Sequence, residues 1–204
     1  LPIIQAPMAG GFNTPDLASV VANSGGVGSF GFSFTRPEKI NEILSATKKL
    51  TSGFINANFF VFKPVNLPKK DVQEEAIKAI ESLSLNEKYE IIIPKEPFYF
   101  DLKSQIEATL ENLPSIITFH LGIPSIDIIK KIQLYGIKVG ITATNITEAK
   151  SIESVGADFI VAQGIEAGGH RGIFDQENID EKITLDNLLI KILNNVSLPV
   201  VAAG

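Results

Sequence analysis

The chain has 204 residues, of which 45% are hydrophobic, and it carries a net charge of −5 at neutral pH. This composition predicts one globular domain over residues 1–204. The lack of a basic stripe and of an apolar run of about 18 residues argues against nucleic acid and membrane partners. With no cysteine and only two histidines, we expect neither a disulfide nor a metal site, which fits a reducing cytoplasm.

Apolar runs alternate with amphipathic helical stretches from the N-terminus onward. Thr14 followed by Pro15 is typical of a helix start, and Asp101 is expected to cap a later helix. The strands that we expect are residues 2–8, 27–30, 53–60, 115–121, 138–144, 158–163 and 199–204. The helices that we expect are residues 14–24, 37–47, 67–85, 101–113, 124–135, 147–155 and 184–194.

The segment 89–100 departs from this alternation. Ile91, Ile92 and Ile93 look like a strand, but prolines and aromatic residues surround them. We therefore interpret this segment as an excursion from the regular pattern.

The expected strands are short, apolar on both faces and separated by helices, a pattern that predicts a parallel sheet covered by helices. Such a sheet is either doubly wound or a (β/α)8 TIM barrel. Two observations favour the barrel: polar groups follow several different strands, and no Gly-x-Gly-x-x-Gly sequence follows the first strand. Because a barrel needs an eighth strand to close, we expect a truncated barrel whose C-terminal part is missing after the seventh strand.

The most informative segment is the loop 163–172, Gln-Gly-Ile-Glu-Ala-Gly-Gly-His-Arg-Gly, which directly follows the apolar run 158–162. Glycines let the backbone approach a ligand closely, and the imidazole of His170 can exchange a proton near neutral pH. A lone loop histidine is often only held by backbone, but the glycines and the preceding strand favour an active-site wall. We interpret Glu166 as a loop anchor paired with Arg171 rather than as a catalytic acid.

Five segments of the chain resemble the nitronate monooxygenase family, once called 2-nitropropane dioxygenases. They are residues 5–11 (QAPMAGG), 58–60 (NFF), 118–122 (TFHLG), the loop 163–172 and residues 200–204 (VVAAG). The match runs in consistent order through nearly the whole chain, and the histidine of the third segment points to class I of the family. The resemblance implies a TIM barrel that contains FMN and oxidises alkyl nitronates with O2 to a carbonyl compound and nitrite.

The resemblance also implies roles for particular residues. His170 would act as a base or orienting group beside the substrate, and His120 would line the same pocket. Asn58 would hydrogen-bond the polar edge of the flavin, and Gln163 would direct its amide toward the ring. The other positions expected at the cofactor are Pro7, Met8, Ala9, Gly168, Gly169 and Gly204, the last of which would begin a phosphate-binding turn.

Two other interpretations stay open. FMN-dependent enoyl-ACP reductases, which use NAD(P)H, share the Glu-Ala-Gly-Gly-His sequence of the loop, although their first-strand motif lacks the Ala6-Pro7 pair. A chain that ended at Gly204 would instead be a non-catalytic flavin-binding fragment without an eighth strand. The expected partners are a small nitronate or nitroalkane and O2, and the sequence does not indicate an oligomeric state.

Overall fold

The structure is a computed structural model, which describes residues 1–83 and 95–204. The strand-like residues 91–93 of the predicted excursion lie outside the described residues. The chain divides into two compact units, one made of residues 1–62 with 100–204 and the other made of residues 63–99. The first unit contains the sheet and the candidate site.

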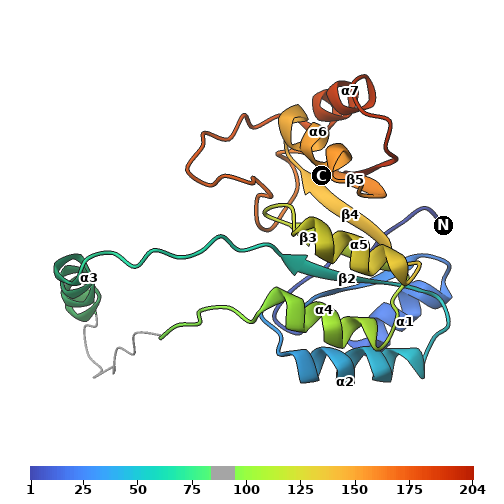
Figure 1. The fold of residues 1–204 in the computed structure, drawn as a ribbon, viewed down its shortest axis with the longest axis horizontal. Helices are drawn as coiled ribbons and strands as arrows, with labels where there is room; N and C mark the ends of the chain where they lie inside the picture. The colour runs from blue at the N-terminus through green and yellow to red at the C-terminus, as the bar shows by residue number, and fades with distance from the viewer. Residues whose placement is uncertain (84–94) are drawn as a thin grey trace. The chain divides into compact units, whose positions relative to one another are not determined.

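Six parallel strands of the first unit form one sheet whose order follows the sequence (Figure 1). The strands are β1 (Val27–Gly31), β2 (Phe54–Phe60), β3 (Ile116–His120), β4 (Lys138–Ala143), β5 (Phe159–Gln163) and β6 (Val200–Ala203). The helices of this unit are α1 (Pro15–Asn23), α2 (Pro37–Lys48), α4 (Leu102–Leu110), α5 (Ile126–Leu134), α6 (Ile146–Ser154) and α7 (Leu185–Leu193). The second unit contains α3 (Lys70–Leu83).

Two helix starts follow the expected chemistry. The Thr14 hydroxyl accepts a hydrogen bond from Leu17 N (3.2 Å), and α1 begins at the next residue, Pro15. The Asp101 carboxylate accepts from Ser104 N (2.9 Å) at the start of α4. Both side chains satisfy backbone N–H groups that have no partner inside the helix, so both predicted caps are confirmed.

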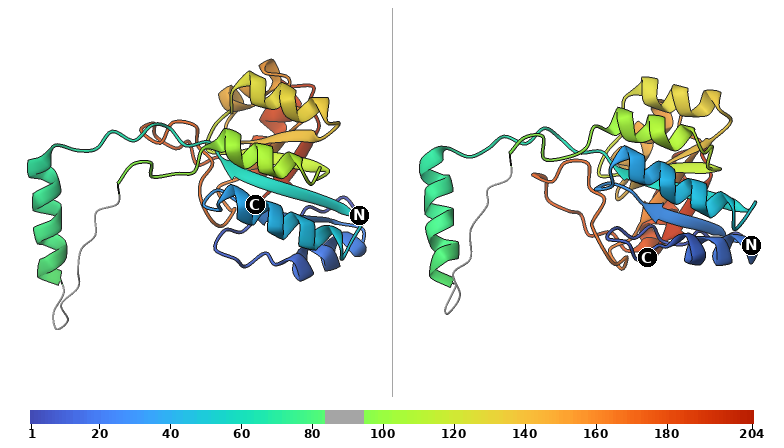
Figure 2. Two further views of the ribbon diagram at one scale, coloured as in Figure 1. Left: turned by 60° about the horizontal axis from the view of Figure 1, so that its bottom comes forward. Right: turned by 90° about the horizontal axis from the view of Figure 1, so that it is seen from below.

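The order of the strands identifies the fold class. In a doubly wound sheet the order reverses at one point, and helices cover both faces. Here the order runs from β1 to β6 without reversal, and right-handed crossovers then place every connecting helix on the same face. Figure 2 shows α2, α4 and α5 side by side over that face. The predicted fold class is confirmed, because the sheet forms part of a (β/α)8 barrel.

The expected first strand at residues 2–8 is wrong in extent. Only Ile4 forms a bridge to the sheet, opposite Val27 at the start of β1. Pro7 has no N–H to donate, and the N–H of the following residue donates to the side chain of Asn13 (3.0 Å). The segment therefore leaves the sheet after a single bridge and continues as a loop.

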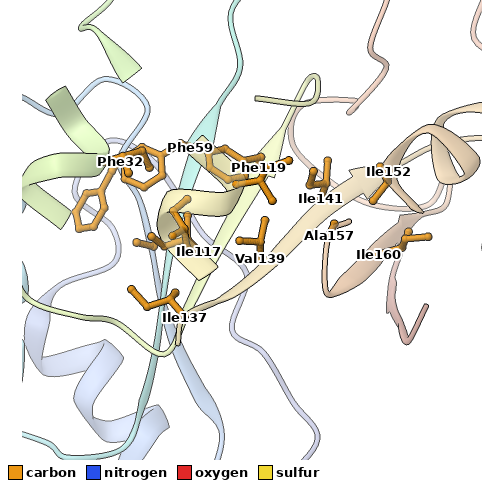
Figure 3. Close-up of a cluster of buried hydrophobic side chains, with 14 of the residues drawn as sticks. Phe32, Phe59, Ile117, Phe119, Ile137, Val139, Ile141, Ile152, Ala157 and Ile160 are labelled. Atoms are coloured by element: carbon orange, nitrogen blue, oxygen red, sulfur yellow. The ribbon is translucent and has the colours of Figure 1, made fainter. Parts of the chain in front are cut away.

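The strands present one apolar and one polar face. The helix-facing positions include Phe59 in β2, Phe119 in β3, Ile141 in β4 and Ile160 in β5, all fully buried in the core (Figure 3). The alternate positions, which face the other side of the sheet, include Asn58, Thr118, Thr142 and Gln163. The interpretation of the strands as apolar on both faces is therefore wrong for the inner face, because that face lines a cleft and not a second helix layer.

Candidate active site

A cleft of about 870 Å³ lies on the inner face of the sheet, at the C-terminal ends of the strands. Ligand and cofactor sites usually have volumes of roughly 300–1,000 Å³. All ten residues predicted for the site line this cleft, namely Pro7, Met8, Ala9, Asn58, His120, Gln163, Gly168, Gly169, His170 and Gly204. The location matches that of active sites in (β/α)8 barrels.

Residues 7–9 form one wall of the cleft, and Asn13 fixes their backbone. The buried Asn13 side chain accepts a hydrogen bond from Met8 N (3.0 Å). It also donates to Ala6 O (3.2 Å) and to Ser29 O in β1 (2.6 Å). One amide therefore attaches the wall to the first strand of the sheet.

Close packing of this wall against β1 depends on Gly31. A Cβ at this position would lie 2.9 Å from Ala9 N and 2.9 Å from the carbonyl carbon of Met8. Both contacts are with backbone atoms, which cannot move aside as a flexible side chain can. A residue without a side chain is therefore required where the wall meets the strand.

A row of hydrogen bonds crosses the inner face from β1 to β3. Asn56 Nδ2 donates to Ser29 Oγ (3.3 Å), and Thr118 Oγ1 donates to Asn56 Oδ1 (3.1 Å). Asn58 Nδ2 donates to Thr118 Oγ1 (2.9 Å) and to the carbonyl oxygen of the same residue (3.3 Å). Within the described part of the chain no group donates to Asn58 Oδ1. This oxygen is therefore an acceptor available to a ligand in the cleft.

Gln163, at the end of β5, holds the loop 163–172 through both atoms of its amide group. Its Nε2 donates to His170 O (2.9 Å), and its Oε1 accepts from Gly172 N (2.7 Å). The sequence predicted this amide beside the cofactor. The structure places it on the cleft wall with its nitrogen and oxygen bonded to the loop backbone.

Arg171 pairs with Asp180 and not, as the sequence suggested, with Glu166. Its Nε lies 2.9 Å from Asp180 Oδ2, and its Nη1 donates to Gln163 O (2.5 Å). The hydrogen bond from Arg171 lowers the pKa of the Asp180 carboxyl below its ordinary value of 3.8. Glu166 instead accepts from Leu185 N (3.0 Å), one of the N–H groups at the start of α7 that have no partner within the helix. Glu166 is thus a loop anchor, as expected, but its partner is a helix end.

The two histidines meet through a backbone atom. His120 Nε2 lies 3.0 Å from the carbonyl oxygen of His170. The ring of Phe60 contacts both imidazoles, with centroid distances of 5.4 Å to His120 and 5.3 Å to His170. Burial lowers the pKa of His120 below its ordinary value of 6.5, which favours the neutral ring. The side chain of His170 is exposed on the cleft wall.

Sequence reasoning assigned no role to Asn13, which holds the wall of the cleft, or to Phe34 and Phe60, which line it. Phe34 and Phe60 line the cleft with a ring-centroid distance of 6.1 Å, and they give it an apolar border beside the histidines. The available signal for Phe34 was an aromatic residue in the loop after a strand, where it is 55% exposed. Asn13 left no such signal, because its partners belong to segments on both sides of it.

The described ranges, residues 1–83 and 95–204, contain no group of three His, Asp or Glu side chains that could hold a metal ion. In the same ranges no helix is long and apolar enough to cross a membrane. The cleft offers imidazole, amide and backbone groups to a ligand.

A family model described as nitronate monooxygenase matches residues 1–204, the whole chain. Among curated proteins, the nitronate monooxygenase of Paraburkholderia phytofirmans is 38% identical over 215 residues, and that of Pseudomonas aeruginosa is 37% identical over 207 residues. Both matches cover 100% of this chain but only 56% and 58% of the relatives. The chain thus spans little more than half the length of the curated relatives it matches.

Two solved structures are similar over nearly the whole chain. A nitroalkane oxidase from Streptomyces ansochromogenes has a TM-score of 0.85 at 30% identity, and the match covers 99% of this chain and 58% of that one. FabK from Thermotoga maritima has a TM-score of 0.69 at 22% identity, and the match covers 98% of this chain and 50% of that one. The second likeness concerns the fold alone.

Proposed function

The chain belongs to the nitronate monooxygenase family, and on this premise we propose that its cleft binds FMN and that the protein oxidises alkyl nitronates with O2 to a carbonyl compound and nitrite. The observation that carries the proposal is the convergence, in one cleft, of all ten residues that the family resemblance assigns to cofactor and substrate. These residues come from both ends of the chain and from three different strands.

The groups in the cleft fit a flavin. Asn58 Oδ1 has no donor within the described residues and would accept a hydrogen bond from an N–H on the polar edge of the ring. A Cβ at Gly168 or Gly169 would meet nothing within 4 Å, so the loop presents bare backbone to the cleft. The backbone of residues 7–9 would lie against the ring, and Gly204 would approach the phosphate.

The step that we assign to the chain's own residues is the removal of one proton from the substrate. FMN, when bound, would supply the acceptor for the electrons that the substrate loses. A neutral nitroalkane must first lose its α-proton, whereas a nitronate has already lost it. His170 is exposed on the cleft wall and is the group that we assign to take this proton. A positioned base of this kind contributes about 10²–10⁴-fold to the rate.

The first test is spectroscopic. Full-length purified protein should be yellow, with the absorption bands of a flavin, and it should consume O2 when a preformed nitronate is added. A correctly folded full-length sample that stays colourless and takes up no added FMN would contradict the proposal. If anaerobic NADH bleached the flavin rapidly and a nitronate did not stimulate O2 uptake, the enoyl-reductase interpretation would be favoured instead.

The second test concerns His170. The variant His170→Asn should lose activity with a neutral nitroalkane by about 10²–10⁴-fold and should lose much less with the preformed nitronate. Steady-state kinetics with both substrates measure this difference. Equal losses on the two substrates would rule out the base role.

A further inference from the structure

Two side chains from different strands donate to the same backbone oxygen. The carbonyl oxygen of His170 lies 2.9 Å from Gln163 Nε2 and 3.0 Å from His120 Nε2. Gln163 ends β5 and His120 ends β3, and β4 lies between these strands in the sheet. A carbonyl oxygen has two lone pairs, so this oxygen has the two hydrogen bonds that it can readily accept.

The contact with the His170 carbonyl shows which nitrogen of the His120 ring carries the hydrogen. A carbonyl oxygen cannot donate, so Nε2 of His120 must carry the hydrogen. Nδ1 lies beside Gly172, where a Cβ would be 3.1 Å from it and 2.7 Å from Cε1 of the ring. One ring nitrogen is therefore bonded to the loop, and the other is packed against it. Neither nitrogen has the position expected of a group that exchanges protons with a substrate.

The loop after His170 is tied down at two further points. Gly172 N donates to Gln163 Oε1 (2.7 Å), and Phe174 N donates to Glu148 Oε1 (2.9 Å). The peptide bond after His170 is held by the two hydrogen bonds to its carbonyl oxygen, and the guanidinium of the next residue, Arg171, is bonded to Gln163 O and to Asp180. The direction of the His170 side chain thus depends on how its carbonyl group is held.

We propose that His120 is a positioning residue, whose Nε2–H holds the His170 carbonyl together with Gln163 and so directs the His170 imidazole into the cleft. The proposal rests on the base role of His170 given above. It requires a hydrogen-bond donor at the position of Nε2 and does not require an imidazole at residue 120. This requirement separates positioning from direct proton transfer by His120.

Two variants of the full-length protein test this requirement. His120→Phe keeps a flat ring against Phe60 and removes the donor. His120→Gln removes the ring and keeps an N–H donor at a similar distance from the backbone. Asn195→Ala, an exposed site in the turn after α7, serves as the control that should leave every readout unchanged.

The first readout is kinetic. With a neutral nitroalkane, His120→Phe should lower kcat by up to about 100-fold, because a small displacement of a catalytic group costs about this much. His120→Gln should restore most of that loss, and in both variants the loss of kcat with a preformed nitronate should be smaller than the loss with the neutral nitroalkane. If the Gln variant were as slow as the Phe variant while both remained folded, His120 would be a proton-transfer group and the proposal would be wrong. Equal losses on both substrates in the Phe variant would likewise overturn it.

The second readout needs no substrate and no turnover. The NMR signal of the His170 imidazole, identified by its loss in His170→Asn, should shift and broaden in His120→Phe and return toward its original position in His120→Gln. An unchanged signal in His120→Phe would overturn the proposal even if nitronate oxidation were established. If the wild-type protein did not oxidise nitronates, a shifted and rescued signal would still support the positioning contact, so the two failures can be told apart.

Discussion

The Nε2 atom of His120 lies 3.0 Å from the carbonyl oxygen of His170, although the two residues are 50 positions apart in the sequence. The contact uses the N–H of one histidine and the backbone of the other, so the imidazole of His170 stays free to face the cleft. His120 is half-buried where it makes this contact, and this burial has consequences for the pH dependence of stability.

We expect His120 to make the protein less stable as the pH falls through the ordinary range of histidine. Burial lowers the pKa of its imidazole below 6.5. The unfolded chain then binds a proton at a pH where the folded chain does not, and the free energy of unfolding decreases as the pH falls from above 6.5 through the lowered folded value. Urea unfolding at about pH 7.5 and about pH 5.5 should show a smaller pH difference for His120→Phe than for the wild type. An identical difference in both proteins would contradict this prediction.

Asn13→Ala should weaken both folding and cofactor binding. The substitution removes three hydrogen bonds, to Met8 N, Ala6 O and the buried Ser29 O, and leaves these backbone groups without the amide that holds them. We expect a loss of about 1–3 kcal/mol in the free energy of unfolding and a higher Kd for FMN, because residues 7–9 lose their attachment to β1. Denaturation and flavin titration measure the two effects. Asn23→Ala, which removes two exposed hydrogen bonds, to Leu50 O and from Thr51 Oγ1, is the matched control; it should cost less stability and leave the Kd for FMN unchanged. Flavin affinity that survived the loss of Asn13 would show that the wall holds its shape by other means.

Gly31→Ala and Gly168→Ala should affect different properties, the first the stability and the second the affinity for FMN. At Gly31 the added Cβ would lie 2.9 Å from backbone atoms, and we expect a cost of about 1–3 kcal/mol in stability. At Gly168 the added Cβ would meet nothing within 4 Å, so the stability should be unchanged while the Kd for FMN rises. Thermal unfolding and flavin titration of both variants test the pair. Unaltered flavin affinity in Gly168→Ala would place the cofactor away from this loop.

Asp180→Asn should loosen the loop 163–172 at neutral pH. It should also remove the part of the stability that is lost when Asp180 is protonated. The hydrogen bond from Arg171 lowers the pKa of Asp180, so the carboxylate contributes stability that is present above about pH 4 and is lost as the pH falls through the lowered value. We expect a loss of about 1 kcal/mol or less at neutral pH, since both side chains retain some exposure. Amide hydrogen exchange of the loop should accelerate in the variant. Glu42→Gln, which breaks the exposed pair with Lys39, is the control that should have no effect on the loop.

Much of the site could be predicted because its residues stand in recognisable local patterns. The glycine-rich loop follows a buried strand, and His170 and Gln163 belong to it, so the sequence itself placed them at a strand end. The predicted pairing of Arg171 with Glu166 was wrong, because no local pattern specifies the partner of Arg171. Two carboxylates, Glu166 and Asp180, lie within reach along the chain, and only the path of the loop decides which of them meets the guanidinium.

The first strand and the wall of residues 7–9 show the same limit. Their apolar sequence predicts pairing with the sheet, but the proline at position 7 and the side chain of Asn13 redirect the backbone after one bridge. No local pattern indicates this, because Asn13 acts on residues before it and on Ser29 after it.

The sequence by itself determined the alternation of strands and helices, the barrel class and the segments from which the cleft is built. Hydrophobic periodicity and turn residues are local properties that predict the alternation and favour the barrel, whereas the resemblance to a known family assigned the segments of the cleft. Only the tertiary structure decided that Gln163 and His120 share one acceptor, the carbonyl oxygen of His170. That meeting spans β3 to β5 across an intervening strand, so it depends on strand register and on the return of the loop over the sheet, which no single segment encodes.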